Sequence, residues 1–335
     1  MTFQTILVAI LIFGFLIVIH EFGHFIFAKL SGVVVEEFAI GMGPKLFGYQ
    51  GKETKYSLRL IPMGGYCQML GEDAEDYQSG SFNSKSKLAR ILILSAGSLM
   101  NFLGCIVLLT IIFFIVGVPS TTLDLIEKDY PAYEAGLRQG DIIVAIEGKD
   151  VDSWEDVTSQ ISSVEENIYS VDVLRDGQQM NFNVASKFDE ELNQHRIGIT
   201  SQREKSIFSS ITNGFKQTFL YGKLILESLG QLFTGEVSTD SLTGPIGIVS
   251  VVGQSIEYGI VAVLNLAAVI SINLAIFNIL PIPALDGSRI LFVIIEAIKG
   301  SPVSPEKEGK IHFVGFALLI IVAIFVAYND ILRLR

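Results

Sequence analysis

Four apolar runs constrain this chain more than any other feature. They cover roughly 4–29, 90–117, 259–281 and 311–329, and each is long enough for a helix that crosses a bilayer, which takes about 20 residues. Of the 335 residues, 50% are hydrophobic and 18% are charged. This is too apolar for an ordinary soluble protein and too polar for one buried wholly in lipid. The sequence therefore predicts a polytopic α-helical membrane protein with four transmembrane helices and a soluble insertion.

The distribution of basic residues predicts how these spans are oriented. Residues 1–28 contain no Lys or Arg, so the basic start of a cleavable signal peptide is missing and the first run is expected to remain as a helix. Segment 30–90 carries seven Lys and Arg residues, which by the positive-inside rule places it in the cytoplasm and the N-terminus outside. Segment 120–203 then lies outside, and the basic segment 290–310 lies inside. Two arginines near the C-terminus fall outside, a weak violation of the rule.

The acidity of the chain is concentrated in one segment. Residues 120–205 contain 18 Asp and Glu against 8 Lys and Arg, while the net charge of the whole chain is −11. This predicts a solvated domain, and the lack of a basic stripe argues against nucleic-acid binding. The pattern A-G-L-x-x-G-D-x-I-x-x-I-x-G, from Ala135 to Gly148, resembles the PDZ family, whose members bind chain ends or strands at a sheet edge. Strands are expected at 142–146, 168–174 and 180–185, and a helix at 153–163.

A β-hairpin is predicted between the first two spans. Residues 56–60, Tyr-Ser-Leu-Arg-Leu, alternate apolar and polar side chains as a strand does. Pro62 is expected to limit this strand to an edge or an end. Such an edge would pair with an extended substrate, which makes Tyr56, Leu58 and Leu60 candidate substrate-binding residues. The alternative is an ordinary short cytoplasmic hairpin.

The first apolar run contains His20-Glu21-Phe22-Gly23-His24. The two histidines are four residues apart, so both lie on one helical face and both imidazoles can reach one zinc ion. Glu21 is placed to take a proton from water at that zinc. Ionisable side chains inside a spanning segment are expensive and need a partner or a function. The alternative is a polar patch packed against another helix.

The third apolar run ends in a second polar motif. Pro281 and Pro283 lack backbone N–H groups and are expected to stop the helix, and broken backbone at membrane depth is tolerated only beside protein or a water-filled cavity. Asp286 follows and is a candidate third zinc ligand, or alternatively a helix cap. In the predicted topology His20, His24 and Asp286 all lie at the inner end of a span, which favours one shared site.

Two further features concern helix packing. Small residues in the second run predict close contact between helices. Asn101 in the same run is expected to form interhelical hydrogen bonds more readily than to take part in the chemistry. Phe208, Ile211, Phe215 and Phe219 recur at helical spacing, which predicts an amphipathic helix at 206–233, either on the outer membrane surface or packed on the PDZ-like domain.

The predicted organisation is a first transmembrane helix at 1–30, a cytoplasmic-side membrane-associated β-hairpin or sheet at 31–89, a second transmembrane helix at 90–117, an extracytoplasmic PDZ-like α+β domain at 120–203, an amphipathic helix and linker at 204–257, a third transmembrane helix at 258–289, a cytoplasmic loop at 290–310 and a fourth transmembrane helix at 311–330.

Together these motifs resemble the site-2 protease family of intramembrane zinc metalloproteases, in its bacterial RseP-like branch. The resemblance rests on H-E-F-G-H in the first span, A-G-x-x-x-N in the second, the inserted PDZ-like domain, and N-x-x-P-x-P-x-L-D-G in the third. It implies Zn²⁺ held by His20, His24 and Asp286, with Glu21 as general base. It also implies that Asn278 contacts the substrate backbone or a developing oxyanion; from the residues alone, Asn278 is equally a source of interhelical hydrogen bonds.

The resemblance also implies substrates and location. The expected substrates are single-span membrane proteins, such as anti-sigma factors or remnant signal peptides, cut after a first extracytoplasmic cleavage. The expected location is a bacterial cytoplasmic membrane, where the lipid bilayer surrounds the spanning helices and the active site lies near the cytoplasmic side. This chain departs from the family at Ser98, where proline is expected, and has room for one PDZ-like domain where RseP relatives carry two. Two other classes compete: an inactive membrane-anchored PDZ scaffold and a zinc-binding transporter.

Overall fold

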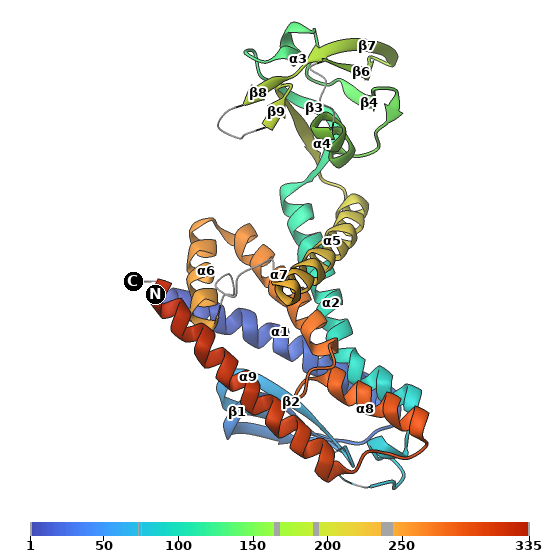
Figure 1. The fold of residues 1–335 in the computed structure, drawn as a ribbon, viewed down its shortest axis with the longest axis vertical. Helices are drawn as coiled ribbons and strands as arrows, with labels where there is room; N and C mark the ends of the chain where they lie inside the picture. The colour runs from blue at the N-terminus through green and yellow to red at the C-terminus, as the bar shows by residue number, and fades with distance from the viewer. Residues whose placement is uncertain are drawn as a thin grey trace. The chain divides into compact units, whose positions relative to one another are not determined.

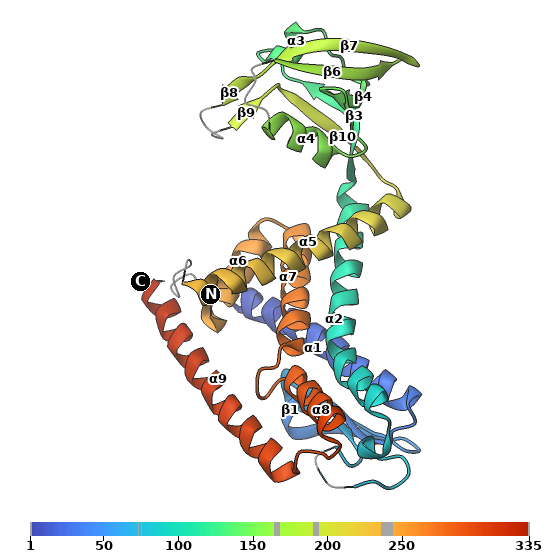
Figure 2. The ribbon, with the colours of Figure 1, turned by 45° about the vertical axis from the view of Figure 1, so that its right-hand side comes forward.

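A computed structural model describes residues 2–72, 74, 76–163, 168–189, 194–235 and 244–333. The chain divides into two compact units. The first, here called the helical unit, comprises 1–112 and 214–335; the second, here called the PDZ-like unit, comprises 113–213. Figures 1 and 2 label the elements within each unit.

Four of the described helices are long and apolar enough to cross a membrane, as predicted. The close packing of the first two depends on glycine, because a Cβ on Gly23 would lie 2.4 Å from the Ala96 carbonyl oxygen. The second helix runs on through Ser98 without interruption. The four helices are α1 (Phe3–Leu30), α2 (Lys87–Val116), α7 (Ile260–Ile279) and α9 (Pro305–Arg333).

The third span is shorter than predicted, and a helix replaces most of the predicted cytoplasmic loop. Helix α7 ends at Ile279, not at 289, because Pro281 and Pro283 follow directly. Helix α8 (Asp286–Lys299) then occupies much of segment 290–310. Its strongly one-sided apolar pattern explains this: one face, including Val293, is buried in the core.

The described parts of segment 204–257, which are 204–235 and 244–257, contain two helices where one was predicted. Helix α5 (Ile207–Thr234) agrees with the predicted helix at 206–233 and meets α2 closely at Gly214, where a Cβ would lie 2.5 Å from the Thr110 hydroxyl. Helix α6 (Pro245–Glu257) was not predicted. Its Pro245 occupies the first turn, where a missing N–H costs nothing. Asp330 of α9 accepts hydrogen bonds from the backbone N–H groups of Gly244 and Gly247, at 3.1 and 2.8 Å.

The predicted hairpin region forms a sheet of β1 (Val35–Gln50) and β2 (Lys55–Met69). The strand does not stop at Pro62, contrary to the prediction, and continues to Met69 past Gly64, which adopts φ +89°. The sheet packs on α1, α2 and α8 around one apolar core, so three helices and the sheet enclose the same space. This core contains Ala28, Val33, Val35, Phe38, Cys67, Met69, Phe82 (in the short 3₁₀ helix η1, Phe82–Ser84), Ile93, Leu94 and Val293.

The PDZ-like unit contains a six-stranded sheet in the order β10-β3-β4-β6-β7, with β5 paired to β4. The strands predicted at 142–146, 168–174 and 180–185 correspond to β4, β6 and β7, and the predicted helix to α4. Asp141 is buried and ion-paired with Arg175 at 2.7 Å. Element bounds are β3 (Val118–Ile126), α3 (Pro131–Glu134), β4 (Ile142–Ile146), β5 (Lys149–Asp150), α4 (Trp154–Ser163), β6 (Ile168–Arg175), β7 (Gln178–Ala185), β10 (Ile199–Glu204), and the separate pair β8 (Lys187–Asp189) and β9 (Gln194–Arg196).

Candidate metal centre

Three predicted ligands meet in the helical unit. Asp286, at the first residue of α8, places Oδ2 3.0 Å from His20 Nε2 and 3.3 Å from His24 Nε2. The two Nε2 atoms are 3.2 Å apart, and one possible ligand atom from each of the three residues lies within 4.8 Å of the other two. Asp286 Oδ2 is buried without a conventional hydrogen bond. Two imidazoles and a carboxylate oxygen converging in this way fit a tetrahedral zinc with an open fourth position.

Helix α2 orients both imidazoles through their other nitrogens. His24 Nδ1 lies 2.8 Å from the Ile93 carbonyl oxygen, which can only accept, so this nitrogen carries the proton and Nε2 is free to bind metal. His20 Nδ1 lies 3.3 Å from Nδ2 of Asn101. Asn101 is fully buried, and its Oδ1 has no partner. When His20 Nε2 binds metal, Nδ1–H must donate, and turning the Asn101 amide by 180° supplies the acceptor and satisfies that oxygen.

Gly97 explains why α2 can lie so close to the histidines. A Cβ at this position would lie 2.5 Å from His24 Nε2 and 2.7 Å from His20 Nε2, closer than any real contact. The small residues of the second span therefore do more than permit helix packing, because Gly97 leaves the room in which the ligand nitrogens sit.

Glu21 faces the C-terminal part of strand β2. Its carboxylate lies near the backbone N–H of Cys67, and a Cβ on Gly65 would lie 3.2 Å from its Cγ. Burial raises the pKa of the Cys67 thiol, so this cysteine is a neutral neighbour and not a competing thiolate ligand. The space in front of Glu21 is lined by His24, Tyr66, Cys67, Gln68, Met69, Glu72, Leu94, Asp286 and Arg289.

The prediction that Tyr56–Leu60 forms an open sheet edge is wrong for its first half. Phe38 of β1 is in register with both Tyr56 and Cys67, and Ile40 with both Leu58 and Gly65. Residues 55–58 are also in register with 47–50 on their other side. The backbone at Tyr56 and Leu58 is therefore enclosed between two stretches of β1, although their side chains are partly exposed.

The edge beside Glu21 is residues 65–69. Among the described pairings these residues are in register with β1 on one side only. Leu70 N–H bonds the Val34 carbonyl on that side, and backbone groups alternate in direction along a strand. The groups of Gly65, Cys67 and Met69 therefore point to the other side, where Glu21 lies. Tertiary folding alone creates this edge, because the alternation of residues 56–60 carries no information about which strands flank them.

Asn278 lies half-buried in the last turn of α7. It is not among the described residues that line the space in front of Glu21. Its predicted role as a substrate contact therefore stays a prediction.

Two buried histidines and a glutamate in an apolar helix long enough to cross a membrane, with an aspartate from the start of α8, define a candidate site for a metal-dependent hydrolase. The model of peptidase family M50 matches residues 8–322. The chain therefore belongs to peptidase family M50, the site-2 protease family, and is a zinc metalloprotease. Its helices and relatives make it a bacterial membrane protein.

Three similar proteins come from other bacteria. A candidate zinc metalloprotease of Clostridium acetobutylicum is 37% identical over 333 residues, covering 99% of this chain and 98% of that protein. The regulator of sigma-W protease RasP of Bacillus subtilis is 33% identical over 417 positions, covering 99% of both chains, and the zinc metalloprotease RasP of Shouchella clausii is 32% identical over 415 positions, again covering 99% of both. Both RasP alignments are longer than this chain, so these two proteins carry residues with no counterpart here.

Among solved structures, the PDZ domain of an SdrC-like protein from Listeria monocytogenes is 22% identical. It covers 25% of this chain and 86% of that domain, with a TM-score of 0.22.

Proposed function

We propose that this protein is an intramembrane endopeptidase that cuts the transmembrane segments of single-span membrane proteins. One observation carries the proposal: His20, His24 and Asp286 converge within 4.8 Å beside Glu21, and both histidines lie in an apolar helix long enough to span the bilayer. A polar cluster of this kind is costly in a membrane and is retained for a function.

The residues divide the reaction between them. When bound by His20, His24 and Asp286, zinc supplies a Lewis acid that acidifies water and polarises a peptide carbonyl. Glu21 accepts a proton from the attacking water and later delivers it to the leaving amine. The nearby Cys67 backbone places the Glu21 carboxylate at the open edge of the strand.

The decisive experiment compares wild type with Glu21→Gln. Each is co-expressed with a tagged single-span membrane protein, and zinc is measured on the purified enzyme. We expect the variant to keep zinc and lose cleavage. Glu53→Gln is the matched control, because Glu53 is an exposed carboxylate paired with Lys29 at 2.9 Å and should cut normally. Equal cleavage by all three proteins would refute the role of Glu21, whereas no cleavage by any of them would favour a peptide-binding scaffold.

We place the substrate on the edge formed by residues 65–69. A helical substrate has its carbonyls tied up in hydrogen bonds and must unwind before attack, and an unwound strand can pair with a free sheet edge. In the Glu21→Gln background, Gln68→Cys should form a disulfide with a cysteine placed near the cleavage site of the substrate. Leu58→Cys serves as the comparison. A stronger crosslink at 58 than at 68 would contradict this assignment.

The proposed orientation puts the N-terminus and the PDZ-like unit outside the cell membrane and the β1–β2 sheet inside. The asymmetry of basic residues supports it. Cysteines introduced at Glu53 and Lys128 test it with a membrane-impermeant maleimide on intact cells. We expect labelling at position 128 alone, whereas labelling at position 53 alone would show that the chain has the opposite orientation.

The PDZ-like unit is proposed to restrict the enzyme to substrates already shortened outside, such as cleaved anti-sigma factors or remnant signal peptides. The name of the B. subtilis relative, a regulator of sigma-W protease, supports the first of these classes. Deleting residues 122–203 should allow cleavage of full-length substrates. If full-length substrates stay uncut while shortened ones are still cleaved, this unit does not act as the gate.

A further inference from the structure

The fourth spanning helix contacts the loop that carries the third metal ligand. His312 Nδ1 of α9 accepts a hydrogen bond of 3.0 Å from the Ala284 backbone N–H, two residues before Asp286. One turn further along α9, a Cβ on Gly315 would lie 2.2 Å from Pro283 Cβ and 2.9 Å from its carbonyl carbon and oxygen. Helix α9 thus touches this loop through two neighbouring positions on one helical face.

The loop has an unusual residue at its tightest point. Leu285 N–H bonds the Ile282 carbonyl at 3.1 Å, so residues 282–285 form a turn with Pro283 second and Ala284 third. Ala284 adopts φ +76°. This is the pattern of a type II turn, in which the third residue is ordinarily glycine because a Cβ is strained there. The N–H of that third residue is not used by the turn, and here His312 binds it.

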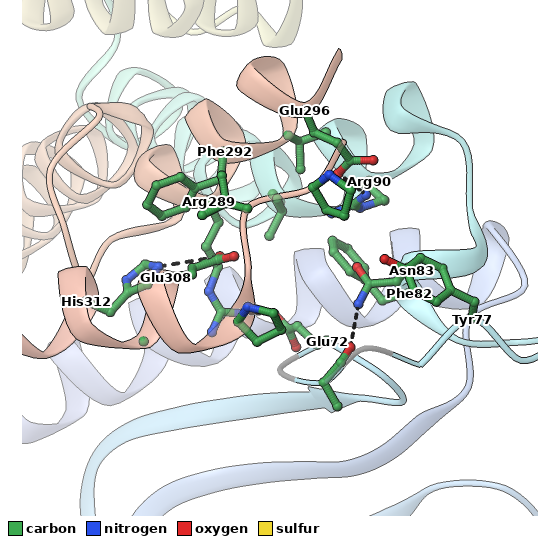
Figure 3. Close-up of a pocket in the computed structure, with 17 residues that line it drawn as sticks. Glu72, Tyr77, Phe82, Asn83, Arg90, Arg289, Phe292, Glu296, Glu308 and His312 are labelled. Carbon is green, nitrogen blue, oxygen red and sulfur yellow. Dashed lines mark hydrogen bonds and ion pairs between the residues drawn. The ribbon is translucent and has the colours of Figure 1, made fainter. Parts of the chain in front are cut away.

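We propose that His312 is a positioning residue for Asp286: its acceptor nitrogen holds Ala284 in the left-handed conformation and so aims Asp286 at His20 and His24. This inference rests on the proposed metal site and adds a residue from a helix that contributes no ligand. The His312 ring packs edge-on against Phe292, with centroids 5.8 Å apart, and its Nε2 lies 3.7 Å from Glu308 Oε1. Figure 3 shows His312 directed toward Glu308, beside Phe292.

The geometry defines the role of His312 narrowly. Since Nδ1 accepts, the neutral ring carries its proton on Nε2, and Glu308 favours that tautomer. What Ala284 requires is an acceptor at the position of Nδ1, which the side-chain oxygen of asparagine can supply. The ring itself fills space against Phe292. A phenylalanine therefore keeps the packing and loses the acceptor, while an asparagine keeps the acceptor and loses much of the packing.

The test measures zinc affinity of the full-length protein in detergent, by competition with a chromophoric chelator, so it does not depend on activity. His312→Phe should weaken zinc binding by about 10- to 100-fold, as loss of a ligand-orienting group does, while His312→Asn should stay within a few-fold of wild type. Adding Ala284→Gly to His312→Phe should restore most of the affinity, because glycine adopts positive φ without the hydrogen bond. Val314→Ala, at an exposed neighbouring position, is the control and should bind normally.

A purely structural role for His312 predicts a different pattern. In that case the loss would follow packing, so His312→Asn would be the weaker binder and Ala284→Gly would rescue nothing; either result overturns the proposal. Thermal unfolding of each variant checks that the helical unit is intact. Failure of Glu21→Gln to abolish cleavage would refute the proposed reaction and leave this zinc measurement unaffected, so the two proposals fail separately.

Discussion

Removing the polar end of Asn101 should weaken zinc binding from one helix away. In Asn101→Leu the side chain keeps the same branched arrangement of heavy atoms but offers no acceptor to His20 Nδ1, now 3.3 Å from the amide. Asn101 is fully buried, so water cannot replace it, and an unpaired buried N–H costs about 1–3 kcal/mol. Since about 1.4 kcal/mol is tenfold in affinity, the zinc dissociation constant should rise by about 5- to 150-fold.

The assay is chelator competition on purified protein, with cleavage then measured at saturating zinc. Asn101→Asp retains an oxygen acceptor and should stay close to wild type, since a carboxylate is a common partner of a metal-bound histidine. Ser271→Ala is the matched control: its hydroxyl donates to the Asn101 backbone carbonyl at 2.7 Å, in the same buried contact but not toward His20. Wild-type affinity in Asn101→Leu, or an equal loss in Ser271→Ala, would refute the reasoning.

Three other predictions follow from the packing and charges. Gly97→Ala should abolish zinc retention with the chain still inserted, because its Cβ would lie within 2.7 Å of both ligand nitrogens; metal analysis of membrane-extracted protein checks this, and a zinc-loaded variant would contradict it. Burial acts to raise the pKa of Glu37, but hydrogen bonds from Ser57 and from basic neighbours outweigh it and hold the pKa at about 2. This carboxylate therefore stabilises the fold at pH values above its ordinary pKa of 4.5, and the stabilisation is lost as the pH falls toward 2. At pH 7, Glu37→Gln should therefore have a free energy of unfolding about 1–2 kcal/mol below that of wild type, seen as a lower melting temperature. This difference between variant and wild type should narrow below pH 4.5, and a difference that stays constant with pH would argue against the role of Glu37. Asp141→Asn should destabilise the PDZ-like unit by about 3 kcal/mol, because it leaves the guanidinium of Arg175 unpaired beside a buried site; limited proteolysis of the full-length protein measures this, and unchanged resistance would refute it.

The sequence was most informative where chemistry repeats at fixed spacing. The four-residue step from His20 to His24 puts both on one helical face whatever surrounds them, and Pro281 and Pro283 lack the N–H groups that would continue a helix. Asp286 could be joined to the histidines because the predicted chain crosses the membrane twice between His24 and Asp286, and an even number of crossings returns it to the same side. These are local or counting arguments, which need no knowledge of packing.

Other parts of the site depend on distances that no local pattern encodes. The alternation at Tyr56–Leu60 marked a strand, but which stretch of β1 lies on each side of it follows from long-range pairing, so the free edge came to be 65–69. Helix α6 was missed because Gly244, Pro245 and Gly247 at its start are residue types typical of a turn, and its N-terminus is satisfied by Asp330 from a remote helix.

By itself, then, the sequence determined the class of the protein, the four helices long and apolar enough to cross a membrane, and the identity of the groups that converge at the candidate metal site. Only the tertiary structure decided what supports them: Ile93 and Asn101 behind the histidines, the Cys67 backbone against Glu21, and His312 beneath the turn before Asp286. The physical reason is that ligands must be particular residue types, whereas a group that orients a ligand needs only a donor or acceptor at the right place. A backbone carbonyl serves as well as a side chain there, and many sequences can supply it.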